Sequence, residues 1–141
     1  MYSLHEVDGV SHADTIHQFN SLIEEWPSLK PHHLTDGYWW ISYLEDEPIA
    51  FAGLCPFEPF TGVGYLKRCL VKPDHHGHGL QFRMLMAREL KAKQLGWTTL
   101  VSECRESNTF SADNFRRAGF ERCEPEQKWG EPNSIFWVKY L

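Results

Sequence analysis

The sequence predicts an α/β fold in which a mixed, mostly antiparallel central sheet carries helices on both faces. Short runs of β-branched and aromatic residues recur along the 141 residues, and segments of helical periodicity separate some of them. The early runs follow one another through short turns, which favours antiparallel hairpins. Two later runs are separated by a helical segment, which favours a right-handed parallel crossover. The length is that of one ordinary domain, so we expect residues 1–141 to fold as a single unit.

The first part of the chain reads as a strand, a helix and a hairpin. The helix is expected over residues 12–26, whose apolar side chains form one stripe, with Ser11 as its cap and Pro27 at its end. The other expected elements are a strand over 2–8, a loop over 28–36, strands over 38–44 and 48–55, and a hairpin turn over 45–47.

The second part alternates strands and helices. The longest helix is expected over residues 80–95 and ends at Gly96. A short helix begins at Ser107 or Asn108 and closes at Gly119. The expected strands are 62–71, 97–104, 120–123 and 134–140, with loops over 56–62 and 124–133.

The stretch from Gly64 to Gln81 has the pattern of a strand, a glycine-bearing turn and the start of a helix. Gly77 and Gly79 permit positive φ angles and a close approach of a ligand to the backbone. The free N–H groups and the dipole of a helix start make such a turn an anion site suited to phosphate. A plain strand–helix connection would look similar. The turn lacks the Lys-Ser/Thr ending of a nucleotide-hydrolase loop and the three-glycine dinucleotide motif.

Two segments together resemble motifs of the GNAT superfamily of N-acetyltransferases. Residues 71–81 are similar to its strand-four exit and Q/R-x-x-G-x-G/A loop, with His76 at the Gln/Arg position, Gly79 at the first glycine and Gln81 at the final Gly/Ala position. Residues 108–120 are similar to its N-x-x-S/A…Y-x-x-x-G-F segment, with Phe115 in the place of the tyrosine. The resemblance covers roughly residues 37–141, and Gln81 and Phe115 depart from it.

The resemblance implies an acetyltransferase-like fold whose parallel strands four and five splay apart, and a single acyl-CoA N-acyltransferase domain over residues 1–141. It also implies acetyl-CoA as the acyl donor, with its pantetheine arm in the gap between the two strands. The cofactor-binding residues that it implies are Cys69, Leu70, Val71, His76, Gly77, His78, Gly79, Leu80, Gln81, Asn108 and Phe115.

The chemistry requires a base for the amine proton and a donor for the oxyanion. The resemblance implies a strand-four N–H near Leu70 as that donor. The family often has a glutamate where this chain has Tyr65, so Glu103 of the neighbouring strand is the substitute candidate, with a solvated edge-strand carboxylate as its alternative reading. Tyr65 and Glu58 are weaker candidates. Phe115 cannot donate a proton, so another group or solvent protonates the thiolate.

The histidines and cysteines are expected to bind no metal. In the phosphate turn, hydrogen bonding of phosphate by His76 and surface exposure of His75 and His78 are preferred to a metal site. His32 and His33 are adjacent without matched ligands and are expected to be ordinary loop residues. The four cysteines show no C-x-x-C spacing and are expected to be buried, reduced thiols. No apolar run approaches a membrane span, and we expect a soluble, cytoplasmic protein with no membrane partner.

The charges are unevenly distributed. Residues 1–60 hold ten Asp and Glu against one Lys, a net −9, and residues 61–141 hold nine Asp and Glu against thirteen Lys and Arg, a net +4. The total of −5 argues against a nucleic-acid partner. Because loops of the acidic part are expected to enclose the acceptor, a cationic small molecule or a basic peptide is favoured.

We therefore expect an N-acetyltransferase that moves an acetyl group from acetyl-CoA to a primary amine by direct attack. A non-catalytic acyl-CoA-binding or regulatory domain on the same fold is the alternative, because the family's glutamate and tyrosine are both absent. A nucleotide-binding module is a weaker one. The chain is expected to be a monomer or a homodimer.

Overall fold

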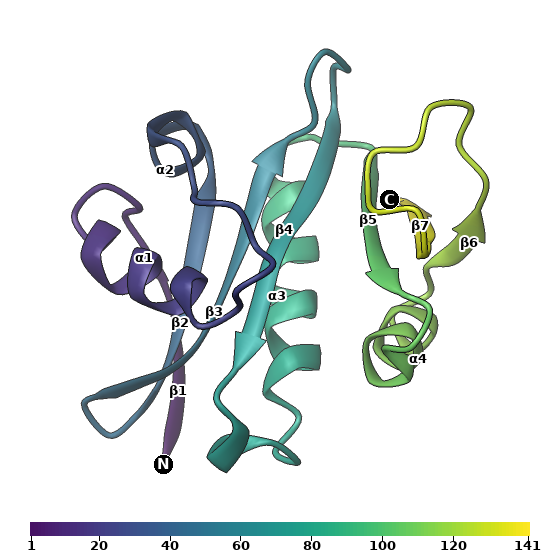
Figure 1. Cartoon of the computed structure of the whole chain (residues 1–141). Coiled ribbons are helices and arrows are strands. Elements are labelled where there is room, and N and C mark those ends of the chain that lie inside the picture. Colours follow the sequence, from purple (N-terminus) through teal and green to yellow (C-terminus); the bar gives the residue numbers. More distant parts are fainter.

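The computed structural model describes residues 1–141 and has one seven-stranded sheet in the order β1-β2-β3-β4-β5-β7-β6 (Figure 1). All neighbouring strands pair antiparallel except β4 and β5, which are parallel. The strands are β1 (Tyr2–Val7), β2 (Tyr38–Leu44), β3 (Glu47–Pro56), β4 (Val63–Val71), β5 (Thr99–Arg105), β6 (Glu121–Cys123) and β7 (Ser134–Tyr140). The predicted mixed, mostly antiparallel sheet with one parallel pair is confirmed.

Helices cover both faces of the sheet, as predicted. On one face lie α1 (Ala13–Ser21) and α2 (Pro31–Asp36), and on the other α3 (Leu80–Gln94) and α4 (Thr109–Arg117) (Figure 1). Alternation along β2 supplies both cores: Trp39 packs with α1 and α2, and Trp40 packs with α3 and α4. None of the helices is both long and apolar enough to cross a bilayer.

The predicted helix over residues 12–26 is wrong in its extent, because α1 ends at Ser21. The Asn20 amide nitrogen donates to the Pro27 carbonyl at 3.0 Å and folds the following segment back. Arg68 of β4 donates to both Asn20 and Pro27. These contacts with a distant strand outweigh the helical periodicity of the sequence.

Two further local predictions are wrong. Residues 31–36 of the expected loop form α2, which begins with Pro31 at its first position and has the Lys30 N–H donating to His33 Nδ1 at 3.0 Å. Ser11 does not cap α1. Its own N–H instead donates to the Asp8 carboxylate at 2.8 Å, in the turn before the helix.

The cysteines are all unpaired; Cys55 and Cys104 are buried, and Cys69 and Cys123 are half-buried. Burial raises the pKa of the Cys55 thiol to about 11. These thiols are therefore protonated and unreactive near neutral pH.

The parallel strands β4 and β5 separate soon after they begin. They pair only at three positions, from Val63 with Thr99 to Tyr65 with Val101. Ser102 then donates its hydroxyl to the Leu66 carbonyl at 3.1 Å, which holds the end of the paired region. Beyond it the strands diverge toward the ends from which α3 and α4 start (Figure 1).

Strand β4 is bulged where the divergence begins. The register with β3 shifts between Ala52 and Gly53, and Arg68 is the extra residue, with a φ of 60°. The buried Arg88 of α3 donates from Nη1 to the carbonyls of Gly53 and Arg68 at 3.1 and 3.2 Å. Arg88 thus pairs, from the α3 side of the sheet, with two carbonyls at the bulge.

Candidate active site

The diverging strands border a cleft of about 740 Å³, whose walls include Tyr65 to Leu70 of β4 and Ser102 to Arg105 of β5. A second cavity of about 370 Å³ lies against the turn before α3. The residues that line both cavities are Cys69, Leu70, Gln81, Asn108 and Ser111. The two cavities therefore form one path along β4, from the turn to the point where the strands part.

The turn at one end of this path has the properties of a phosphate site. Gly77 and Gly79 have φ angles of 86° and 73°, and no atom lies within 4 Å of where either Cβ would be. Gly79 is the N-terminal cap of α3, so the N–H groups of the first helical turn have no partner within the helix. The space and the free donors fit a pyrophosphate.

The three histidines of the turn have different partners. His76 Nε2 donates to the Val71 carbonyl at 2.7 Å, which ties the turn to the end of β4. His75 Nδ1 lies 2.9 Å from the Tyr2 hydroxyl, and the ring of His78 packs on that of Tyr2. His78 does not line either cavity, whereas the other turn residues singled out from the sequence do.

The register of β4 decides which of its backbone groups face the cleft. The Lys72 N–H donates to the Ile49 carbonyl of β3 at 2.9 Å. Backbone groups alternate between the two sides of an antiparallel ladder, so those of Leu70 point to β3 and those of Cys69 and Val71 point away from it. The Leu70 N–H expected as the oxyanion donor is therefore directed away from the cleft, and the Cys69 N–H has the suitable direction.

Glu103 lies at the other end of the path and is held by two donors. The Tyr65 hydroxyl donates to Oε1, and Trp129 Nε1 donates to Oε2 at 2.8 Å. Burial raises the pKa of the Glu103 carboxyl, against the opposing effect of these hydrogen bonds. Burial also raises the pKa of Tyr65, so its hydroxyl remains a donor.

The alternative reading of Glu103 as a solvated edge-strand carboxylate is wrong. Strand β5 lies inside the sheet, between β4 and β7, and Glu103 is half-buried. A carboxylate has about four acceptor positions, and the two donors leave some of them open toward the cleft. Glu103 is therefore placed to accept a proton. The weaker candidate Glu58 lies outside both cavities, in the loop between β3 and β4.

Helix α4 presents polar and aromatic groups to the cleft. Asn108 caps the helix by accepting from the Ser111 N–H at 3.1 Å, and Gln81 Nε2 donates to the Ser111 hydroxyl at 2.9 Å. Gln81 thus bridges α3 and α4. Phe115 is buried, lines the cleft and stacks on Trp137 with ring centroids 5.5 Å apart.

Asn114, next to Phe115, carries the only buried side-chain nitrogen or oxygen without a hydrogen-bond partner. It is 5% exposed, it lines the cleft, and its Nδ2 has no acceptor. An unpaired buried donor costs about 1–3 kcal/mol, so the site favours a ligand with an acceptor at that place.

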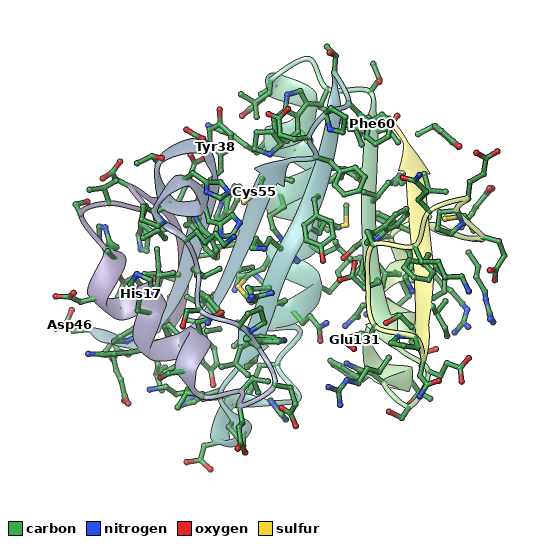
Figure 2. All side chains as sticks on the ribbon, turned by 45° about the horizontal axis from the view of Figure 1, so that its top comes forward. His17, Tyr38, Asp46, Cys55, Phe60 and Glu131 are labelled. Carbon is green, nitrogen blue, oxygen red and sulfur yellow. The ribbon has the colours of Figure 1, made fainter.

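The charges of the cleft differ from the expectation drawn from the sequence. Of the ten acidic side chains in residues 1–60, only Glu25 lines the cleft. Asp46 lies at the far edge of the α1 half, well away from Glu131 on the β7 side (Figure 2). Lys67 and Arg68 line the cleft instead. Residues 23 and 25–27 of the acidic part line the cleft, but apart from Glu25 its carboxylates do not, so the cleft lacks the strongly acidic lining expected from the sequence.

Sequence reasoning missed Asn114, Trp129 and the pair Lys67 and Arg68. No local signal identified Trp129, which comes from the loop after β6 and reaches Glu103 only through the fold. No local signal identified Asn114 either, because it stands between Asp113 and Phe115 in α4.

The comparisons with known proteins agree with this geometry. A family model described as "Acetyltransferase (GNAT) family" matches residues 3–120. No curated protein matches the chain. Among solved structures, the chain is similar to a ribosomal-protein-alanine N-acetyltransferase from Brucella melitensis, with 18% identity, a TM-score of 0.74 and coverage of 99% of both chains.

Two other solved structures are similar over their full length. They are an IAA acetyltransferase from Bacillus cereus, with 13% identity, a TM-score of 0.76 and coverage of 100% of both chains, and an N-acetyltransferase from Staphylococcus aureus, with 13% identity, a TM-score of 0.79 and coverage of 99% of this chain and 98% of that one. Identities this low show a shared fold and say nothing about the acceptor.

Proposed function

We propose that the chain, which belongs to the acetyltransferase (GNAT) family, transfers an acetyl group from acetyl-CoA to a primary amine by direct attack. The observation that carries the proposal is Glu103, a half-buried carboxylate at one end of a path whose other end is an open glycine turn. A donor-binding site and a proton acceptor are thus connected by one cleft. The amine is that of a small molecule or a peptide.

The donor is held mainly by backbone groups in this proposal. The first-turn N–H groups of α3 bind the pyrophosphate next to Gly79, and the outward-facing Cys69 carbonyl and Val71 backbone groups pair with the pantetheine amides. Phe115 packs against the arm, and Asn108 holds the start of α4 in place. His76 supports the turn through the Val71 carbonyl.

The thioester supplies an acetyl carbon at which a C–N bond forms while the C–S bond breaks. Glu103 accepts the proton that the attacking amine loses, directly or through water. The Cys69 N–H donates to the carbonyl oxygen as negative charge develops on it. Tyr65 and Trp129 fix the orientation of the carboxylate.

The departing thiolate requires no acid from the position of Phe115. A thiol has a pKa of about 8.5, so its thiolate leaves readily and takes a proton from solvent. Phe115 nevertheless keeps the alternative of a non-catalytic acyl-CoA-binding domain open, because the family's usual proton donor is missing.

The test is the release of free CoA thiol from acetyl-CoA in the presence of amines, peptides and aminoglycosides, followed with a thiol reagent. The proposal expects amine-dependent release by the wild type, and release at least about 100-fold slower by Glu103→Gln. Binding of CoA without release for any acceptor would favour the non-catalytic domain. Preference for ATP or NAD over CoA would favour a nucleotide-binding module.

A further inference from the structure

Two neighbouring cations of β4 face the same cleft because of the bulge. Successive side chains of a regular strand point to opposite faces, and a bulge breaks this alternation. Lys67 and Arg68 accordingly both line the cleft, with Lys67 Nζ 5.8 Å from the centre of the Tyr65 ring and Arg68 stacked 5.1 Å from that of Trp26. Glycine at position 53 accommodates the distortion, since a Cβ there would lie 2.6 Å from Trp39.

Neither Lys67 nor Arg68 forms an ion pair, whereas Lys91, Lys93, Lys139 and Arg116 each do. Arg68 is fixed by its bonds from Nε to Asn20 at 2.7 Å and from Nη2 to Pro27 at 3.1 Å, and both acceptors are uncharged. Its Nη1 donates to nothing. Two half-buried cations therefore present unused donors to the cleft.

Glu25, Glu103 and Glu131 line the same cleft, but none of them forms an ion pair with Lys67 or Arg68. Glu103 is the one carboxylate that acts electrostatically on both, and its oxygens accept from Tyr65 and Trp129 rather than from either cation. Lys30 adds a further positive charge near Lys67. Burial lowers the pKa of Lys67, the effect expected of an ammonium without a partner.

We propose that Lys67 and Arg68 form a subsite for an anionic group of the acceptor, so that the acceptor is a primary amine that also carries a carboxylate or a phosphate. The inference rests on the proposed function, because it orients the amine toward Glu103 and the anion toward the bulge. An anion there pairs with two desolvated cations, whereas a purely cationic acceptor meets them with like charge. An α-amino acid, or an amine with a phosphate a few bonds away, has the required pair of charges.

The experiment compares amines that differ only in the anionic group. The compounds are glycine, alanine, glutamate, lysine and phenylalanine, each with its amide and with the amine that lacks the carboxylate, together with O-phosphoethanolamine and ethanolamine. We expect kcat/KM of the wild type to be about tenfold higher, or more, for the anionic member, as one charge-assisted hydrogen bond gives. The carboxylate and phosphate arms show which anion is used.

Variants connect the preference with the subsite. Lys67→Met keeps the length of the side chain and removes its charge, so the anionic preference should fall about tenfold, and Lys67→Glu should favour the neutral members. Lys72→Met is the matched control, because Lys72 is also half-buried, lies just after β4 and has its Nζ over the ring of Phe19, yet lines neither cavity. CoA affinity and melting temperature verify that each variant is folded.

Calorimetric dissociation constants for the same compounds, measured with CoA present and without it, provide a second criterion. If no compound is acetylated, the proposed function fails by the absence of CoA release, and these constants still decide the inference. Equal or weaker binding of the anionic members in the wild type overturns the subsite. A preference for the anionic compounds that persists in Lys67→Glu would also overturn the subsite.

Discussion

At the scale of the residue, the cleft contains polar groups whose burial is costly without a partner. Glu103 is a carboxylate largely withdrawn from water, and its two donors restrict it to one orientation. Asn114 offers a buried donor to the same cleft without any acceptor. Such groups are retained where a ligand or a reaction compensates for their cost.

Replacing Glu103 by Gln should lower kcat by about 100-fold to 10,000-fold, the usual contribution of a general base. The base acts when unprotonated and its pKa is raised above the ordinary value of 4.5, so the wild-type rate should rise with pH from above that value. This rise of the rate with pH should be absent in Glu103→Gln. The rise at higher pH that comes from deprotonation of the acceptor amine should remain in the wild type and in the variant. Steady-state kinetics across pH provide the measurement.

The control for Glu103 is Glu106→Gln, which removes a carboxylate from an exposed position just beyond the end of β5. Its kcat should stay within a factor of two of the wild type, on the order expected of an exposed surface change. A Glu103→Gln enzyme with the wild-type kcat and pH profile would exclude Glu103 as the base.

Replacing Asn114 by Leu should stabilise the free protein by about 1 kcal/mol or more, because an unpaired buried donor is removed. The same change should weaken CoA binding if Nδ2 donates to the donor molecule. Thermal unfolding and calorimetry measure the two effects. Asn20→Leu is the contrast, because the Asn20 amide is equally buried but donates to Pro27 and accepts from Arg68, so its loss should destabilise. Destabilisation by both changes would indicate that the Asn114 amide is used within the fold.

At the scale of the element, the start of α3 and the end of β4 act together. His76 ties the turn to the Val71 carbonyl, and Gly77 and Gly79 hold left-handed φ angles that leave the helix start uncovered. Both glycines are open to solvent or ligand rather than packed against the protein. The turn therefore leaves the first N–H groups of α3 accessible to a ligand.

Gly79→Glu should raise the dissociation constant of CoA by about 100-fold or more, since hydrogen bonds to a charged group contribute about 1.5–3 kcal/mol each and a carboxylate repels phosphate. Calorimetric titration with CoA is the measurement. Gly96→Glu is the matched control: Gly96 also has a positive φ, of 77°, and open space around it, but it follows the other end of α3. Its backbone strain is the same, and CoA affinity should persist. Tight CoA binding by a folded Gly79→Glu variant would contradict the phosphate site.

At the scale of the whole molecule, the sheet consists of two halves that pair at only three positions and share the hydrophobic core under α3 and α4. The short pairing of β4 with β5 joins them at one end, and Gln81 reaches Ser111 across the gap. Behind the sheet, Lys139 of β7 donates to Glu89 of α3 and to the Ala118 carbonyl at 2.6 Å each. A ligand between β4 and β5 would add contacts to both halves.

Such a ligand should stabilise the entire chain. CoA at 100 times its dissociation constant adds about 2.7 kcal/mol, which corresponds to a rise in melting temperature of about 8 °C for a domain of this size. ATP and NAD at the same concentration should give a smaller rise, because they lack the pantetheine arm. Differential scanning fluorimetry measures the shifts. Equal shifts for the three compounds would favour a nucleotide-binding module.

Much of the fold and the family could be predicted from the sequence, because both depend on local patterns. The hairpins, the helix ending before Gly96, a cap at Ser107 or Asn108 and the parallel pair followed from periodicity and turn residues, and the structure has the cap at Asn108. The two motifs were enough to infer the family, which the match over residues 3–120 confirms. The extent of α1 was missed because Arg68, far away in the chain, pairs with Asn20 and Pro27.

The tertiary structure alone decided the chemistry of the cleft. Glu103 became a held carboxylate because β5 lies inside the sheet and Trp129 reaches it from a distant loop. Lys67 and Arg68 face one cleft because a bulge cancels the alternation that a sequence pattern assumes. The uneven charge along the chain did not predict which charged groups line the cleft. Charge acts through distance and burial, and these are set by contacts between segments far apart in the sequence.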